Sequence, residues 1–190
     1  MKLRDSGMPE QPYWESLFDV PLILDRFGLG PECGDVAELG SGYGTFTVPI
    51  AKRIRGCVHA FDIDPRMVES TRERASASGC TNVRVVLRDV LEAGFDLEAS
   101  ACDAVLLFNI LHGERPTELL REAARILRPG GVAAVIHWRT DIETPRGPSA
   151  DIRPSWKQVA GWATQTGMLR ACDDAVELPP WHYGISLLRV

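Results

Sequence analysis

Residues 35–45 read Asp-Val-Ala-Glu-Leu-Gly-Ser-Gly-Tyr-Gly-Thr, a short apolar strand that leads directly into three closely spaced glycines. Helical spacing of apolar residues follows over 46–54, so the glycine segment joins a strand to a helix. Glycine tolerates positive φ and lets a ligand lie against bare backbone. In an open α/β sheet the ligand crevice lies beyond the carboxyl ends of the strands, where this loop belongs. The loop is therefore either a ligand-binding turn or a tight connection that binds nothing.

The segments around this loop alternate between strand-like and helix-like patterns. Strands are predicted at 35–39, 58–61, 83–87, 104–108, 132–136, 175–178 and 184–190, and helices at 46–54, 64–78, 116–127 and 156–166. This alternation predicts an α/β fold with a doubly wound, mostly parallel sheet. Only a short turn at 179–181 separates the last two strands, too little for a crossover, so the final strand should run antiparallel to its predecessor.

Length and composition place the chain among globular domains. It has 190 residues, of which 45% are hydrophobic and 25% charged, which excludes a disordered chain and fits one domain. The net charge of -5 and the pI near 5.4 disfavour nucleic acid as a partner. No apolar run approaches the ~18 residues of a membrane span, and the start shows no signal peptide. The five cysteines form no CxxC pair, so we expect reduced thiols in a cytoplasmic protein.

The residues in and before the loop narrow the class of ligand. Thr45 stands where a dinucleotide fingerprint needs its last glycine, which argues against a nicotinamide oxidoreductase. The Gly-Lys-Ser/Thr ending of a Walker loop is absent. Glu38 directly precedes the loop, and its negative charge would oppose a pyrophosphate but suit an ammonium or sulfonium group. The sequence therefore favours a cationic ligand.

Acidic residues also follow the next two strands. Asp62 lies 18 residues beyond Gly44, where a carboxylate accepts hydrogen bonds from ribose hydroxyls. Asp89, followed by Val90, comes after the third strand, where a carboxylate can accept from an adenine amine. Each acid alone is more simply a helix cap or a solvated side chain. Three acids at consecutive strand ends beside a glycine loop instead favour a nucleoside-containing ligand.

Four short motifs follow one another along the chain at these positions. They are Val36-Ala37-Glu38-Leu39-Gly40-Ser41-Gly42-Tyr43-Gly44, Phe61-Asp62-Ile63-Asp64-Pro65, Arg88-Asp89-Val90 and Leu127-Arg128-Pro129-Gly130-Gly131. In this order and spacing they resemble the motifs of class I S-adenosylmethionine-dependent methyltransferases, closest to the small-molecule branch that includes the quinone-biosynthesis enzymes. The resemblance implies a Rossmann-like, seven-stranded sheet of order 3-2-1-4-5-7-6 with strand 7 antiparallel.

The resemblance also implies roles for particular residues. It assigns cofactor binding to Glu38, Gly40, Gly42, Gly44, Asp62, Asp89, Val90 and Asn109. The glycines would surround the methionine part of S-adenosyl-L-methionine and Glu38 its ammonium, while Asp62 would hold the ribose. Asp89 and the Val90 amide would contact adenine, and Asn109 would line the methyl-transfer centre. Asn109 is not followed by Pro-Pro-Tyr, which argues against amino methylation of nucleic-acid bases.

Polar and aromatic residues gather near the carboxyl ends of the predicted strands. Three histidines there are candidate catalytic residues, although each alone is more simply structural: His112, His137 and His182. Candidate substrate-binding residues are Tyr13, Trp14, Trp138, Arg139, Trp181 and Tyr183. The linker 139–154 and the helix around Tyr13 and Trp14 are expected to close over the site. His59 lies inside a strand and is interpreted as structural. No metal is expected, since the family chemistry needs none.

We therefore predict a single methyltransferase domain over 1–190. Residues 1–34 form an N-terminal helical cap, 35–138 the cofactor-binding core, and 139–190 a linker, a helix and the closing strand pair. Since the sequence shows no inserted substrate domain, a small-molecule acceptor is favoured. The methyl group would be transferred to it by in-line displacement. Alternatives are an RNA or protein methyltransferase, or a non-catalytic S-adenosylmethionine-binding module. No membrane partner is expected, and the last two strands offer a flank for a possible homodimer.

Overall fold

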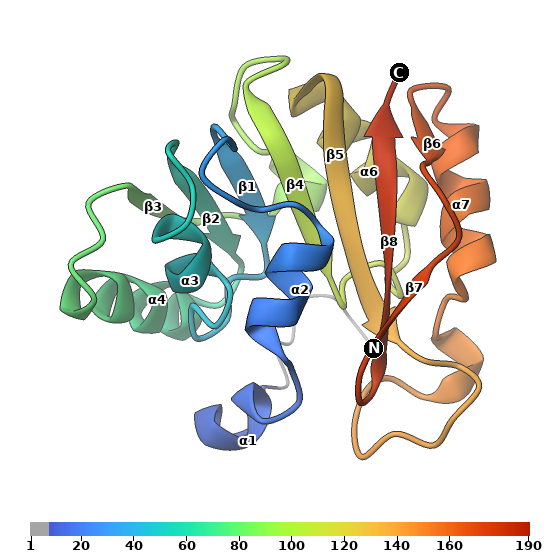
Figure 1. Cartoon of the computed structure of the whole chain (residues 1–190), viewed down its shortest axis with the longest axis horizontal. Coiled ribbons are helices and arrows are strands. Elements are labelled where there is room, and N and C mark those ends of the chain that lie inside the picture. Colours follow the sequence, from blue (N-terminus) through green and yellow to red (C-terminus); the bar gives the residue numbers. More distant parts are fainter. Residues whose placement is uncertain (1–7) are drawn as a thin grey trace.

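The computed structural model describes residues 8–190, in which one eight-stranded sheet carries helices on both faces (Figure 1). The strands are β1 (Val36–Leu39), β2 (Val58–Asp62), β3 (Val83–Leu87), β4 (Cys102–Phe108), β5 (Leu127–Trp138), β6 (Leu169–Ala171), β7 (Val176–Leu178) and β8 (His182–Arg189). Their order is β3-β2-β1-β4-β5-β8-β6, and β7 also pairs with β8. Strands β1 to β5 are mutually parallel, whereas β8 runs antiparallel to β5, β6 and β7. This arrangement confirms the predicted sheet and its antiparallel last strand.

Two details of the sheet differ from the prediction. Strand β5 begins at Leu127 rather than at 132, because Leu127 already has extended backbone angles and pairs with Cys102 at the start of β4. Arg128 precedes Pro129, a position that disfavours helical backbone, so the helix before the strand ends at Ile126. The short β6, at Leu169–Ala171, was absent from the predicted strands and pairs with the end of β8.

The helices have recognisable start sites in the sequence. They are α1 (Gln11–Glu15), α2 (Val20–Arg26), α3 (Thr47–Ala51), α4 (Pro65–Ala77), α5 (Val90–Ala93), α6 (Pro116–Ile126) and α7 (Trp156–Gln165), with a 3-10 turn, η1, at Ala150–Ile152. The Asp64 side chain accepts from the Arg66 amide, and Pro65 occupies the first helical position of α4, as predicted. Helix α7 begins with a capping box formed by Ser155 and Gln158. No helix of residues 8–190 is both long and apolar enough to cross a membrane.

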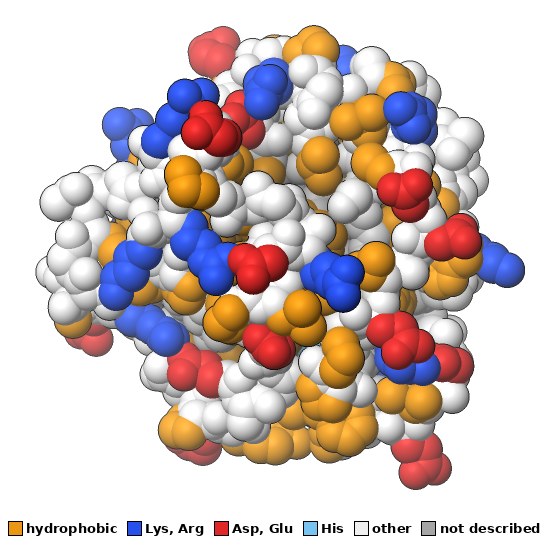
Figure 2. Space-filling model, viewed as in Figure 1, with side chains coloured by type: hydrophobic (Ala, Val, Ile, Leu, Met, Phe, Trp, Pro, Cys, Tyr) orange, Lys and Arg blue, Asp and Glu red, His pale blue; other side chains and the backbone are white. Residues whose placement is uncertain are grey.

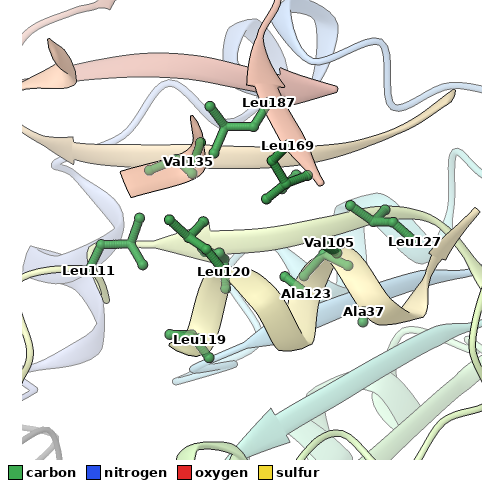
Figure 3. Packing of buried hydrophobic residues seen from close by; sticks show 14 of the residues in the cluster. Ala37, Val105, Leu111, Leu119, Leu120, Ala123, Leu127, Val135, Leu169 and Leu187 are labelled. Carbon is green, nitrogen blue, oxygen red and sulfur yellow. The ribbon is translucent and has the colours of Figure 1, made fainter. Parts of the chain in front are cut away.

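Alternate residues of the strands face two separate hydrophobic layers. On one face Leu119, Leu120 and Ala123 of α6 pack against Val105 and Val135, as Figure 3 shows. The other face is covered by α2 and α3, whose buried residues pack against neighbouring positions of the same strands. Each fully buried aliphatic side chain contributes about 1.5–3 kcal/mol, so both layers fix the sheet firmly. Helix α1 and the linker after β5 lie at the end to which the parallel strands point (Figure 1).

Candidate functional site

A cavity of about 630 Å³ lies at this carboxyl end of the sheet. Its walls come from the glycine loop, the turns after β2, β3 and β4, the end of β5, the N-terminal segment and the linker. The lining residues used below are Met8, Trp14, Gly40, Gly42, Asp62, Asp89, Val90, Phe108, Asn109, Ile110, His112, Trp138, Arg146, Gly147 and Pro148. Its volume falls within the range of small-molecule sites.

The glycine loop forms one wall with bare backbone. Gly40 and Gly42 both have positive φ, of 78° and 55°. A Cβ atom at Gly40 would lie 3.0 Å from Ile110 Cδ1, and one at Gly42 would lie 3.2 Å from Met8 Cε. Both positions therefore favour glycine for backbone conformation, and a side chain at either would also press on a neighbouring side chain. Gly44 also has positive φ but faces Thr71 on α4, outside the cavity wall.

Asp62 ties the end of β2 to this loop and also lines the cavity. Its Oδ2 atom accepts from the Gly42 amide at 2.9 Å, and its Oδ1 atom accepts from the Asp64 amide at 3.0 Å. Burial raises the pKa of Asp62, while the backbone hydrogen bonds favour its charged form. The carboxylate is thus held in one orientation against the glycine loop.

Asp89 follows β3 and combines two functions that the sequence had presented as alternatives. Its carboxylate caps α5 by accepting from the Leu91 and Glu92 amides at 3.1 and 3.3 Å. The same residue lines the cavity, and so does the buried Val90 that follows it. Being a helix cap therefore does not remove Asp89 from the wall of the site.

Glu38 lies beneath the glycine loop rather than in the cavity wall. It is only 3% exposed, and its Oε2 atom accepts from Thr47 Oγ1 at 2.5 Å. Burial, opposed by the Thr47 hydrogen bond and helped by the nearby Asp62 charge, raises the pKa of Glu38 to about 8. This hydrogen bond links β1 to the start of α3, on either side of the loop, and direct contact of Glu38 with a ligand stays a prediction.

Asn109 follows β4 and presents an unpaired polar atom at the site. It has a positive φ of 56°, and its backbone N–H donates to the Ile136 carbonyl at 2.8 Å. Its Oδ1 atom is buried and has no hydrogen-bond partner within the described part of the chain. Since buried acceptors are normally satisfied, this oxygen is an unmet acceptor beside the cavity, and the Nδ2 atom of the same side chain lies 3.5 Å from Nε2 of the buried His182.

The three rim histidines lie close together, but only one lines the cavity. His112 does so, and its Nδ1 lies 3.2 Å from Nε2 of the buried His137. His182 is also buried, with its ring stacked on Phe18 at 4.6 Å and beside Trp138 at 4.2 Å. Burial lowers the pKa values of His137 and His182 to about 3, so both are neutral at physiological pH. His59, as predicted, is structural and lies 3.1 Å from Asp35.

Two of the predicted substrate-binding residues line the cavity. Trp14 comes from α1, and Trp138 from the end of β5, where its ring packs against Gly147 so closely that a Cβ there would lie 2.9 Å away. Phe108, Ile110 and the linker stretch Arg146–Pro148 add further wall; the sequence placed the linker over the site without identifying these residues.

Four other predicted substrate-binding residues lie outside the cavity wall. Tyr13 is 43% exposed, and Arg139 pairs with Asp141 at 2.6 Å and with Glu177 at 3.2 Å. Trp181 packs against the hydrophobic layer on the α2 side. The Tyr183 hydroxyl donates to the Pro154 carbonyl at 2.8 Å, which fastens the linker to β8.

The residues present fit an adenosyl ligand with a positive charge. Two glycines leave a cradle that any side chain would fill, Asp62 and Asp89 supply negative charge, and Asn109 Oδ1 lacks a partner among the described residues. No three His, Cys, Asp or Glu side chains in 8–190 are placed to hold a metal ion.

Comparisons with known proteins agree with this geometry. The profile of the methyltransferase domain family matches residues 36–131. Aklanonic acid methyltransferase of Streptomyces sp. (strain C5) is 31% identical over 99 residues, which are 50% of this chain and 44% of that protein. A mouse tRNA (carboxymethyluridine(34)-5-O)-methyltransferase is 30% identical over 140 residues, 70% of this chain and 19% of that protein. The chain thus spans less than half the length of these two curated relatives.

A solved structure matches nearly the whole chain. The SAM-dependent methyltransferase from Aquifex aeolicus superposes with a TM-score of 0.83 at 26% identity, covering 95% of each chain.

Proposed function

Since the chain belongs to the methyltransferase domain family and is an S-adenosylmethionine-dependent enzyme, we propose that its methyl acceptor is a small molecule bound in the cavity. The observation that carries this proposal is the shape and lining of the acceptor side. Three aromatic residues line the cavity there, namely Trp14, Phe108 and Trp138, together with Arg146, Gly147 and Pro148 of the linker. Such a concave, largely apolar site suits a small molecule better than a folded macromolecule.

We infer that the glycine-loop side of the cavity holds the cofactor. S-adenosylmethionine supplies a methyl group on a sulfonium, a good leaving group for an in-line nucleophile. The backbone at Gly40 and Gly42 would lie along its methionine part, and Asp62 would accept from the ribose hydroxyls. Asp89 and the Val90 amide would contact the adenine. Glu38 and Gly44 would support the loop from outside the cavity wall.

The chain's own residues then contribute alignment and exclusion of water. Aromatic rings on the acceptor side would hold the acceptor at a fixed distance from the glycine loop, which converts a bimolecular encounter into an oriented one. In this proposal 35–138 binds the cofactor, while 139–190 and the N-terminal segment complete the acceptor side. Residues 1–7 of the predicted cap lie outside the described residues.

Surface charge supports a small acceptor over nucleic acid. On the face seen in Figure 2, Lys and Arg side chains are interspersed with Asp and Glu and form no continuous basic surface. The net charge of -5 also opposes binding to a phosphate backbone. Some relatives act on tRNA by name, so RNA belongs in the test as a competing acceptor.

The experiment is a methyl-transfer screen with radiolabelled S-adenosylmethionine. Hydroxylated aromatic small molecules and unmodified tRNA are offered in parallel, with the Asp62→Ala variant as the control for cofactor-dependent transfer. The proposal predicts label in at least one small molecule and none in tRNA. Label in tRNA alone would contradict it.

A further inference from the structure

The pair formed by His112 and His137 connects the cavity to the core. His112 Nδ1 lies 3.2 Å from His137 Nε2, and the two rings are nearly perpendicular at 78°. Within residues 8–190, His112 makes no other side-chain hydrogen bond, and it lines the cavity. Its second ring nitrogen, Nε2, is therefore available to a molecule bound there.

His137 is held rigidly and stays neutral. It lies in β5 between β4 and β8, opposite Tyr183, and its side chain is fully buried. Burial lowers its pKa to about 3, and the nearby His112, His182 and Arg153 all oppose a second proton on its ring. A neutral imidazole has one N–H donor and one lone pair, so His137 can offer His112 only one of the two.

A general base at His112 requires one position for the proton of His137. The Nδ1 atom of His137 is buried without a hydrogen-bond partner among the described residues, so its contact with His112 is the one through which the two rings can orient each other. A proton on Nδ1 makes Nε2 the acceptor. His112 then donates from Nδ1 and keeps the lone pair of its own Nε2.

We propose that His137 is a positioning residue that holds His112 with its proton on Nδ1, so that His112 Nε2 acts as general base toward an acceptor hydroxyl in the cavity. This inference rests on the proposed small-molecule function. The same hydrogen bond persists when His112 takes up a proton, because the imidazolium still donates from Nδ1 to the His137 lone pair. With the opposite tautomers, a protonated His112 would face a second N–H donor.

The base predicts the chemical class of the acceptor. Burial lowers the pKa of His112 below its usual 6.5, which makes it a weak base. Such a base suits a phenolic hydroxyl, with a pKa of about 10, much better than an aliphatic alcohol. The aromatic wall formed by Trp14, Phe108 and Trp138 fits the ring of a phenol.

The proposed step is a phenol O-methylation. The hydroxyl proton passes to His112 Nε2 as the oxygen electron pair forms the new bond to the methyl carbon. The carbon–sulfur bond breaks with its electron pair left on sulfur, and His112 then returns the proton to water.

Long-range proton–nitrogen NMR on histidine-labelled protein, saturated with S-adenosylhomocysteine near neutral pH, reads the tautomers directly. The proposal predicts that His112 carries its proton on Nδ1 with a bare Nε2. A proton on Nε2 overturns it, whatever the activity.

Kinetics with a phenol accepted in the screen give the second readout. His137→Leu should lower the pKa of His112 by about one unit and kcat by about tenfold, because the acceptor for the imidazolium is lost. KM should stay within about twofold, and His137→Gln, whose amide oxygen can accept, should recover most of kcat. His112→Gln, which cannot act as a base, should lose at least about a hundredfold in kcat.

His59→Gln is the matched control, because it alters a structural histidine far from the cavity and should leave these values unchanged. If His137→Leu fails to fold, the tautomers measured by NMR in the wild-type protein still test the proposal. If S-adenosylhomocysteine does not bind at all, the proposed function is wrong; if it binds and Nε2 carries the proton, only this inference is wrong.

Discussion

The two sides of the cavity are built in different ways. The proposed cofactor side, made by Gly40, Gly42, Asp62 and Asp89, consists of turns that directly follow the parallel strands β1, β2 and β3. The acceptor side instead takes Trp14 from α1 and its closing wall from the linker after β5. The proposed cofactor side is therefore fixed by the sheet. The acceptor side depends on helix α1 and the linker, which must pack over the end of the sheet.

A few hydrogen bonds fasten the segments of the acceptor side. The Tyr43 hydroxyl donates to the Pro9 carbonyl at 2.8 Å, and Arg74 pairs with Glu15 of α1. The Arg153 guanidinium donates to the Pro148 carbonyl at 2.7 Å and to the carbonyls of Arg139 and Arg146. Segments fastened by individual side chains are expected to open at a lower free energy than the strands of the sheet, which suits a side that must admit a substrate.

The largest expected effect on ligand affinity comes from breaking the proposed cofactor side. Asp62→Ala removes both the proposed ribose acceptor and the hydrogen bond that orients Gly42. We expect the dissociation constant of S-adenosylhomocysteine to rise at least about tenfold, equivalent to about 1.4 kcal/mol, as measured by calorimetry. An unchanged affinity would remove Asp62 from the ribose role.

Truncating an aromatic residue should affect only the acceptor side. Trp14→Ala should raise the KM of the methyl acceptor by about fivefold, because a ring that packs against it is lost, with cofactor affinity within about twofold. Steady-state kinetics and calorimetry separate the two values. Tyr13→Ala, next to it on α1 but outside the cavity wall, is the matched control. Equal effects of the two variants would contradict the assignment of the acceptor side.

The next expected effect concerns the pH dependence of stability rather than ligand binding, and it involves Glu38 next to the glycine loop. The folded pKa of Glu38 is about 8, against 4.5 for an ordinary glutamate, so the folded protein retains a proton that the unfolded chain releases. The free energy of unfolding should therefore fall as the pH rises from about 4.5 through 8. Glu38→Gln cannot ionise and should lose less stability over that interval. Urea unfolding at several pH values tests this, and parallel pH curves for the two proteins would refute it.

The contrast between the two sides of the cavity also explains which features could be predicted from the sequence. Strand periodicity, the glycines and the acids at strand ends are local patterns, so they led to the correct sheet and to Asp62 and Asp89 at the cavity. Glu38 was harder to place, because adjacency to the loop does not say whether a side chain points into the cavity or beneath it.

The acceptor side depended on tertiary contacts that no local pattern encodes. Trp138 and Arg139 are neighbours in the chain, yet one lines the cavity and the other pairs with Asp141 outside it. His112 and His137 are 25 positions apart, and their contact follows only from the pairing of β4 with β5. The sequence therefore placed residues at the ends of strands correctly but could not show in which direction each side chain points.

The most direct test of the account is thermal unfolding of the protein with S-adenosylhomocysteine and, in parallel, with NAD. A ligand at 100 times its dissociation constant stabilises the folded state by about 2.7 kcal/mol, which for a chain of this size raises Tm by roughly 5–10 °C. We expect this rise with S-adenosylhomocysteine and no rise with NAD. A rise with NAD alone would contradict the assignment of the glycine-loop side to an adenosyl-sulfonium cofactor.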